Sequence, residues 1–325
     1  MRSSRFAVYV FLLLAVLIGS NCAYYNRVIA RKNLVDGSKS YKDRKFPEAE
    51  QLFRDAVSRD PTGETIEGQT AQLFLARTLH SEYIGNRSDK DKAEAAISEY
   101  QKALALNPKD QSSYKAIASL FENLQRNDEW LDWVTKRANN TNIPNEQRAE
   151  ALTSLAAKKN SCANDITDTE QTKKTVTKDG KQTFQFVKPT SPEDLASLQR
   201  CVQEGTALTQ QTAALETDQV RNAKSLDLKS MSDKDLHASQ DYLKVYESAR
   251  SYRASLLVQS MRLAEMEGRT ADHDRFKLES EEARRSFLEL SDVVKKIQTE
   301  LDDREAARAA EAAREKPKAD PNANK

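Results

Sequence analysis

The segment NLVDGSKSYKDRKFPEAEQLFRDAVSRDP, residues Asn33–Pro61, has the pattern of two antiparallel helices joined by a short turn. Counted back from Pro61, small and aromatic residues occupy the positions that such a unit requires: Gly37, Phe46, Ala49, Phe53 and Ala56. Small residues let two helices approach closely, aromatic side chains fill the space between them, and a proline stops the second helix. The segment therefore predicts one complete helix-turn-helix repeat.

Two further units follow this repeat. The second begins near Thr70, and its turn contains the extra stretch YIGNRSDK, residues 83–90, which predicts a flexible or partner-specific loop. The third begins at Gln111, and its second helix carries Trp130 and Trp133. Large aromatic residues at helical spacing usually belong to a core, so we expect both tryptophans to pack between helices rather than to anchor a ligand.

Residues 29–139 resemble three units of the tetratricopeptide repeat (TPR) family. The segments YYNRVIARKNLVDG (residues 24–37) and LAEMEG (residues 263–268) also resemble parts of bacterial envelope TPR proteins. The resemblance implies an all-α solenoid of antiparallel helix pairs. It also implies a scaffold that binds partner proteins or peptides along a concave face lined by the first helix of each pair.

The TPR register assigns seven first-helix side chains to that concave face. They are Tyr41, Lys42, Arg77, His80, Lys115, Glu122 and Asn123. Mixed charge with one aromatic suits recognition of a peptide or helix through hydrogen bonds and apolar anchors. The alternative for each residue is an ordinary solvated helix position, because charged side chains usually lie on solvated faces.

The pattern loosens after residue 139. Residues 140–216 predict a degenerate fourth helix pair, with its first helix at residues 146–158 and its second at residues 192–215. Between them, residues 160–191 predict a small β-hairpin insertion, because TVTKDGKQTFQFVKP alternates β-branched or aromatic residues with polar ones around an Asp-Gly pair.

The C-terminal part predicts a polar insertion at residues 217–238, a long helix pair at residues 239–303 and a frayed or disordered tail at residues 304–325. On the last helix the apolar residues alternate three and four apart. They are Phe287, Leu290, Val294, Ile297 and Leu301. This spacing fits a short coiled-coil seam, but we favour a helix that caps the open end of the solenoid.

Residues 1–25 predict a signal or membrane-anchor segment, because Arg2 and Arg5 precede the apolar run FAVYVFLLLAVLIG at residues 6–19. Three fates are open: an uncleaved anchor, lipidation at Cys22, and cleavage with free secretion. We favour the anchor, because Gly19 and Asn21 do not match lipoprotein processing at Cys22. Neither Ser20 with Ile18 nor Ala23 with Asn21 fits ordinary cleavage well. We expect a membrane-anchored protein of the bacterial cell envelope, with the repeats on the periplasmic side.

The two remaining cysteines are Cys162 and Cys201. In an exported chain they can form a disulfide, and the alternative is two buried, unpaired thiols. No Cys/His spacing typical of a metal site is present.

Catalysis and nucleic-acid binding have little support in the sequence. The net charge is +1, and the three histidines, His80, His237 and His273, lie far apart. Asp272, His273 and Asp274 are best explained as the acidic first turn of a helix. We therefore expect a protein that is not an enzyme, with no cofactor, no metal and no nucleic-acid partner.

Together these features favour a non-catalytic scaffold, tethered at the bacterial cell envelope, that binds a peptide or helix of a partner protein in its concave groove. Two alternatives stay open. One is an accessory subunit of an envelope enzyme, secretion or assembly complex, and the other is a homo-oligomer formed through the C-terminal helix.

Overall fold

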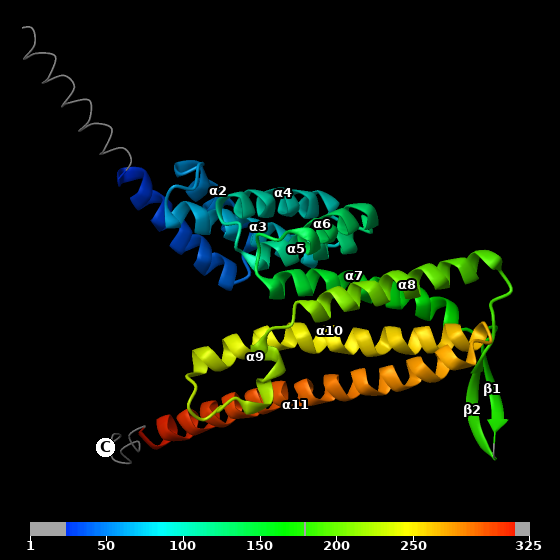
Figure 1. Ribbon diagram of the computed structural model, residues 1–325. Helices are drawn as coiled ribbons and strands as arrows, with labels where there is room; N and C mark the ends of the chain where they lie inside the picture. Colours follow the sequence, from blue (N-terminus) through cyan, green and yellow to red (C-terminus); the bar gives the residue numbers. More distant parts are fainter. Residues whose placement is uncertain (1–23, 179, 316–325) are drawn as a thin grey trace, which may run out of the picture. The chain divides into compact units, whose positions relative to one another are not determined.

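The computed structural model describes residues 24–178 and 180–315, and the chain divides into two compact units, residues 1–130 and 131–325 (Figure 1). Both units consist of antiparallel helix pairs, and the second also contains a two-stranded hairpin and a long C-terminal helix. The predicted fold class, an all-α helix-pair solenoid with a hairpin insertion and a long C-terminal helix, is confirmed.

The first unit is a run of helices joined by short turns. Helical residues 24–42 are followed by α2 (Phe46–Arg59), α3 (Ile66–Gly85), α4 (Lys90–Leu106) and α5 (Gln111–Asn123), and α6 (Asn127–Asn139) begins in this unit. Polar caps set several helix starts. Asp110, for example, accepts hydrogen bonds from the backbone N–H groups of Ser112 and Ser113, which have no partner within the helix.

The first helix pair packs as its sequence pattern requires. Ala49, Phe53 and Ala56 on α2 are fully buried, and the ring of Phe53 lies against Gly37 of the preceding helix. Burying a phenylalanine side chain contributes about 1.5–3 kcal/mol, so this contact is a main source of stability for the pair.

The extra residues in the second unit lengthen a helix instead of forming a loop. Helix α3 continues through Gly85, and only residues 86–89 separate it from α4. Tyr83, at the start of the extra stretch, is 3% exposed and holds this end of α3 in the core. The connection is therefore shorter than the flexible or partner-specific loop predicted at residues 83–90, since only residues 86–89 lie outside the helices.

Helix α6 carries the two tryptophans that were predicted to pack between helices. Trp130 is 7% exposed, in agreement with the predicted packing role, whereas Trp133 is half-buried. Val134 and Ala138 share the buried stripe of this helix, one and two turns beyond Trp130.

In the second unit, α10 packs against α7, α8 and α11. The elements are α7 (Asn145–Thr167), β1 (Lys173–Lys178), β2 (Lys181–Phe186), α8 (Pro192–Ala214), α9 (Asp218–Arg221), a 3-10 turn η1 (Ala223–Ser225), α10 (Asp233–Met266) and α11 (Thr270–Glu315). Tyr246, Leu243 and Leu236 on α10 are fully buried and pack with Ile297 and Leu301 of α11 in one core cluster.

Three predicted boundaries in this unit need correction. Helix α7 continues past residue 158 to Thr167, because Ala163 and Thr167 continue its buried face; the hairpin insertion therefore begins after residue 167. The segment 217–238, predicted as a polar insertion before a helix pair at residues 239–303, places Val220 and Leu236 in the core, and helix α10 already begins within it at Asp233.

The C-terminal helix is longer than predicted. Helix α11 continues to Glu315, so residues 304–315 are helical rather than frayed. Arg304 fixes this part of the helix, because it donates hydrogen bonds to Asp233 and to the carbonyls of Leu228 and Met231. The rest of the predicted tail, residues 316–325, lies outside the described residues.

The hairpin prediction is confirmed. Strands β1 and β2 pair antiparallel with Lys178 opposite Lys181, and Gly180, in the tight turn between them, has a φ of 75°. Such turns need positive φ, which glycine adopts at little cost. A disulfide joins Cys162 of α7 to Cys201 of α8, which is the pairing that the sequence allowed.

Residues 24–178 and 180–315 contain no helix that is both long and apolar enough to span a membrane. The predicted anchor segment, including Cys22, lies outside the described residues.

Candidate partner-binding face

The side chains assigned to the concave face come from three successive first helices: residues 24–42, α3 and α5. We call this surface the first-helix face. Three polar side-chain contacts join neighbouring first helices, and a fourth joins the turn after α3 to α5. They are Arg27 with Glu67, Tyr41 with Ser81, Arg77 with Ser112, and Arg87 with Asn123. The helices therefore form one continuous surface.

Tyr41 and Arg77 meet on this face around Phe74. The ring of Tyr41 lies edge-on to Phe74 with their centroids 5.9 Å apart, and the guanidinium of Arg77 lies 5.4 Å from the centroid of the same ring. The Tyr41 hydroxyl also lies 3.1 Å from Ser81 Oγ. These half-buried groups give the face an aromatic and cationic centre of the kind that dominates many peptide interfaces.

Phe74 is the member of this cluster that the sequence analysis missed. It precedes Arg77 by three residues, so the two side chains lie on the same side of α3. Helical spacing could therefore have found Phe74 once Arg77 was placed. Ser81 and Ser112, which complete the contacts between helices, carry no such signal in the sequence.

His80 makes its contacts away from this cluster. Its Nδ1 lies 3.4 Å from the Tyr100 hydroxyl of α4, and the two rings meet edge to face. Burial lowers the pKa of His80, and the nearby charge of Arg87 lowers it further. Burial likewise raises the pKa of Tyr100. Both shifts favour the neutral form of the side chain, and the contact between the two rings joins α3 to α4.

The remaining assigned residues are exposed. Lys42 lies at the end of the first helix, and Lys115, Glu122 and Asn123 lie on α5. Asn123 Oδ1 accepts a hydrogen bond from Arg87. These side chains add charges of both signs around the Tyr41–Phe74–Arg77 cluster.

Behind this face, one lysine binds two acidic side chains from different helices. Lys92 Nζ of α4 lies 2.6 Å from Glu50 Oε2 of α2 and 2.6 Å from Glu82 Oε2 of α3. Burial tends to raise the pKa of Glu50, but hydrogen bonds from Lys92 and Arg54 outweigh it and hold the pKa below its usual value. Burial and the charge of Glu50 raise the pKa of Glu82. The lysine thereby couples the first and second repeats.

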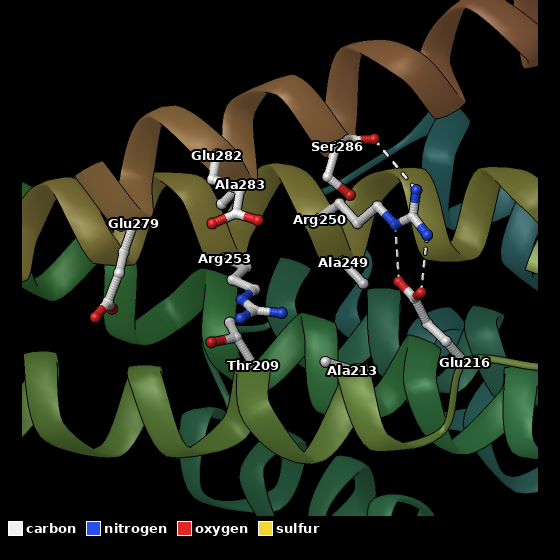
Figure 2. A pocket seen from close by; sticks show the side chains of 10 residues that line it. All are labelled: Thr209, Ala213, Glu216, Ala249, Arg250, Arg253, Glu279, Glu282, Ala283 and Ser286. Carbon is white, nitrogen blue, oxygen red and sulfur yellow. Dashed lines mark hydrogen bonds and ion pairs between the residues drawn. The ribbon is translucent and has the colours of Figure 1, made fainter. Parts of the chain in front are cut away.

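The second unit contains a polar cavity of about 210 Å³ between α8, α10 and α11 (Figure 2). An alanine from each helix faces it, so no large side chain fills the space: Ala213, Ala249 and Ala283. At one end, Arg250 donates two hydrogen bonds of 2.8 Å to the carboxylate of Glu216 and a third to the carbonyl of Ser286.

Charged groups also line the rest of this cavity. Arg253 points from α10 toward Thr209, and Glu279 and Glu282 extend from α11 (Figure 2). The lining therefore offers charges and hydroxyl groups, and it contains no histidine or cysteine.

The Asp272–His273–Asp274 sequence lies in the first turn of α11. Asp272 accepts hydrogen bonds from Arg269 and Arg275, and His273 Nδ1 lies 3.0 Å from Asp274. Within residues 24–178 and 180–315 no three His, Cys, Asp or Glu side chains are grouped so that they could hold a metal ion. The local ion pairs account for these residues.

No protein-family model and no curated protein matches the chain. A solved structure titled "Functional Characterization of Pseudomonas Aeruginosa pilF" is similar to it, with 13% sequence identity over 83% of this chain and 99% of that chain, and a TM-score of 0.30. At this identity and TM-score, the similarity identifies neither an activity nor a partner of the chain.

Proposed function

We propose that the chain is a non-catalytic scaffold that binds an extended peptide or a helix of a partner protein along the first-helix face. The observation that carries the proposal is the cluster of Tyr41, Phe74 and Arg77. It joins side chains from two repeats at a surface where polar contacts already hold three helices side by side. A face built in this way is preformed, so little ordering is needed on binding.

The proposal includes a tether at the bacterial cell envelope. Its support is the sequence at residues 6–19 and the resemblance of residues 24–37 to envelope TPR proteins. Fractionation of the protein in its own host, with its intact mass, tests the tether. An uncleaved membrane-bound chain, or one starting at Cys22 with added acyl mass, supports it. A soluble chain cut near residue 20 contradicts it.

Charge reversal tests the binding face. Lys42→Glu and Lys115→Glu each change one exposed charge on the first-helix face, and Lys90→Glu makes the same change at the exposed start of α4. We expect a stoichiometric partner to copurify with the wild type and the Lys90 variant but to be depleted with the other two. Equal recovery with all four proteins would rule out this face.

A further inference from the structure

The hairpin makes little contact with the core of the second unit. In Figure 1, β1 and β2 extend away from the helices. Among its twelve strand residues, only Phe186 is buried. Phe186 lies under the guanidinium of Arg262, 4.6 Å from its ring centroid, and Thr172 donates a hydrogen bond to the carbonyl of Ile166 at the base. The hairpin is therefore anchored at its base and exposed along the rest of its length.

Both edges of this hairpin present backbone groups without partners. The sheet has only two strands among the described residues. Val187 N–H donates to the Thr172 carbonyl, which marks this opposed pair as hydrogen-bonded. Hydrogen-bonded and non-hydrogen-bonded pairs alternate along an antiparallel ladder. It follows that Thr175 and Thr177 of β1, and Gln182 and Phe184 of β2, direct their N–H and C=O groups outward.

One face of the hairpin is strongly basic. Side chains alternate between the two faces along a strand, and directly opposed residues share a face. Lys174 and Lys178 are four residues apart on β1, and Lys181 is opposite Lys178, so all three lie on the same face. Lys178 is directly opposite Lys181, and like charges in this position destabilise a sheet. No carboxylate within residues 24–178 and 180–315 forms an ion pair with either of them, so an added anionic group would relieve the repulsion.

We propose that this hairpin is the docking site for an extended, acidic segment of a partner protein, which adds to one edge as a third strand. The main chain of that segment would satisfy the outward N–H and C=O groups, and carboxylates at alternate positions would lie over the lysine face. Edge lysines discourage pairing between two copies of the hairpin, but they favour a strand of opposite charge. The site is independent of the first-helix face.

Two features favour a peptide over an anionic lipid surface or a nucleic acid. Phosphate groups would pair with the lysines but would leave the regular row of backbone donors and acceptors on either edge unused. Phe184 is 55% exposed on the opposite face, where it stacks with Lys173 and offers an apolar contact to a residue of the added strand.

The test uses the full chain and a fluorescein-labelled peptide of alternating glutamate and threonine, with fluorescence anisotropy as the readout. We expect the peptide to bind the wild type and the lysine version of the peptide not to bind. Lys178→Glu combined with Lys181→Glu should weaken binding by about tenfold or more, since two charge contacts are reversed. Lys234→Glu combined with Lys244→Glu, on exposed positions of α10, is the matched control and should stay within about twofold.

Proline substitutions separate strand addition from simple charge attraction. Thr175→Pro and Gln182→Pro each remove one outward N–H, on β1 and β2 respectively, without removing a hydrogen bond inside the hairpin. We expect one of them to abolish peptide binding and the other to preserve it. Unchanged binding by both, no binding by the wild type, or binding only to vesicles containing phosphatidylglycerol would each overturn the proposal.

Discussion

The ring of Phe53 occupies the space where a side chain at Gly37 would lie: a Cβ on Gly37 would meet the ring at 2.8 Å. Phe53 is fully buried, so it has no room to move away. The first helix pair therefore depends on a residue without a side chain at position 37.

Gly37→Ala should destabilise the protein by about 1–3 kcal/mol, the usual cost of forcing an extra methyl group into a packed core. Urea unfolding of the full chain measures the change. Gly85→Ala is the control, because nothing lies within 4 Å of a Cβ there. If both variants unfold at the wild-type midpoint, the close packing of Phe53 on Gly37 is wrong.

Lys92→Met should destabilise the protein by about 1–2 kcal/mol at pH 7, because it leaves Glu50 and Glu82 facing each other without the cation that both contact. Adding Glu82→Gln should recover part of the loss, since one of the two like charges is then removed. A double variant that is no more stable than Lys92→Met would contradict the three-residue arrangement.

The cluster of Lys92, Glu50 and Glu82 makes the stability of the protein depend on pH. The pKa of Glu82 is raised in the folded protein, so its contribution favours folding below its unfolded pKa and is lost as the pH rises through the folded value. Protonation of Glu82 also removes its repulsion with Glu50. The destabilisation by Lys92→Met should therefore shrink as the pH is lowered from neutral through the raised pKa. Unfolding curves at several pH values measure this, and a loss that grows in that range would refute the assignment.

Arg250→Gln should cost about 2–3 kcal/mol, because it leaves the carboxylate of Glu216, which is 14% exposed, without its two charge-assisted hydrogen bonds. Arg253→Gln is the matched control in the same cavity, because Arg253 forms no ion pair with any described residue. It should change the free energy of unfolding by less than about 0.5 kcal/mol. A similar loss of stability in both variants would mean that any arginine substitution in the cavity destabilises the protein. The Arg250–Glu216 pair would then have no special role.

Replacing Cys162 and Cys201 by serine should lower the stability of the protein by about 2–4 kcal/mol, because the disulfide restricts a long loop of the unfolded chain. Alkylation of the unfolded, unreduced protein followed by mass spectrometry should label neither cysteine. Labelling of both would show that the thiols are free, and the double variant should then have near wild-type stability.

The parts of the fold that could be predicted are those whose contacts are local in the sequence. One helix pair is predicted by the spacing of Gly37, Phe53 and Ala56, and one turn is predicted by the Asp179-Gly180 sequence. The lengths of the helices were harder to predict from the sequence. Polar residues around Asn160 conceal the continuing buried face at Ala163, and the Ala/Glu/Arg run after residue 303 lacks an apolar stripe although its residues have high helix propensity.

The candidate face was predictable only as a set of helix positions. The TPR register placed Tyr41 and Arg77 on adjacent helices, but it gave no indication that Phe74 lies between them. It also placed His80 with them, whereas the His80 ring lies against Tyr100. Because successive residues of a helix point about 100° apart, a small error in register or helix rotation redirects a side chain.

The central claim is that a partner binds along the first-helix face. Its most direct test is site-specific photo-crosslinking in the native host, with a benzophenone amino acid in place of Lys42 or Lys115 and, as control, in place of Gln101, which is exposed on α4. The account predicts the same discrete crosslinked partner from both first-helix positions and none from Gln101. Equal crosslinking from Gln101, or none from either first-helix position, would contradict it.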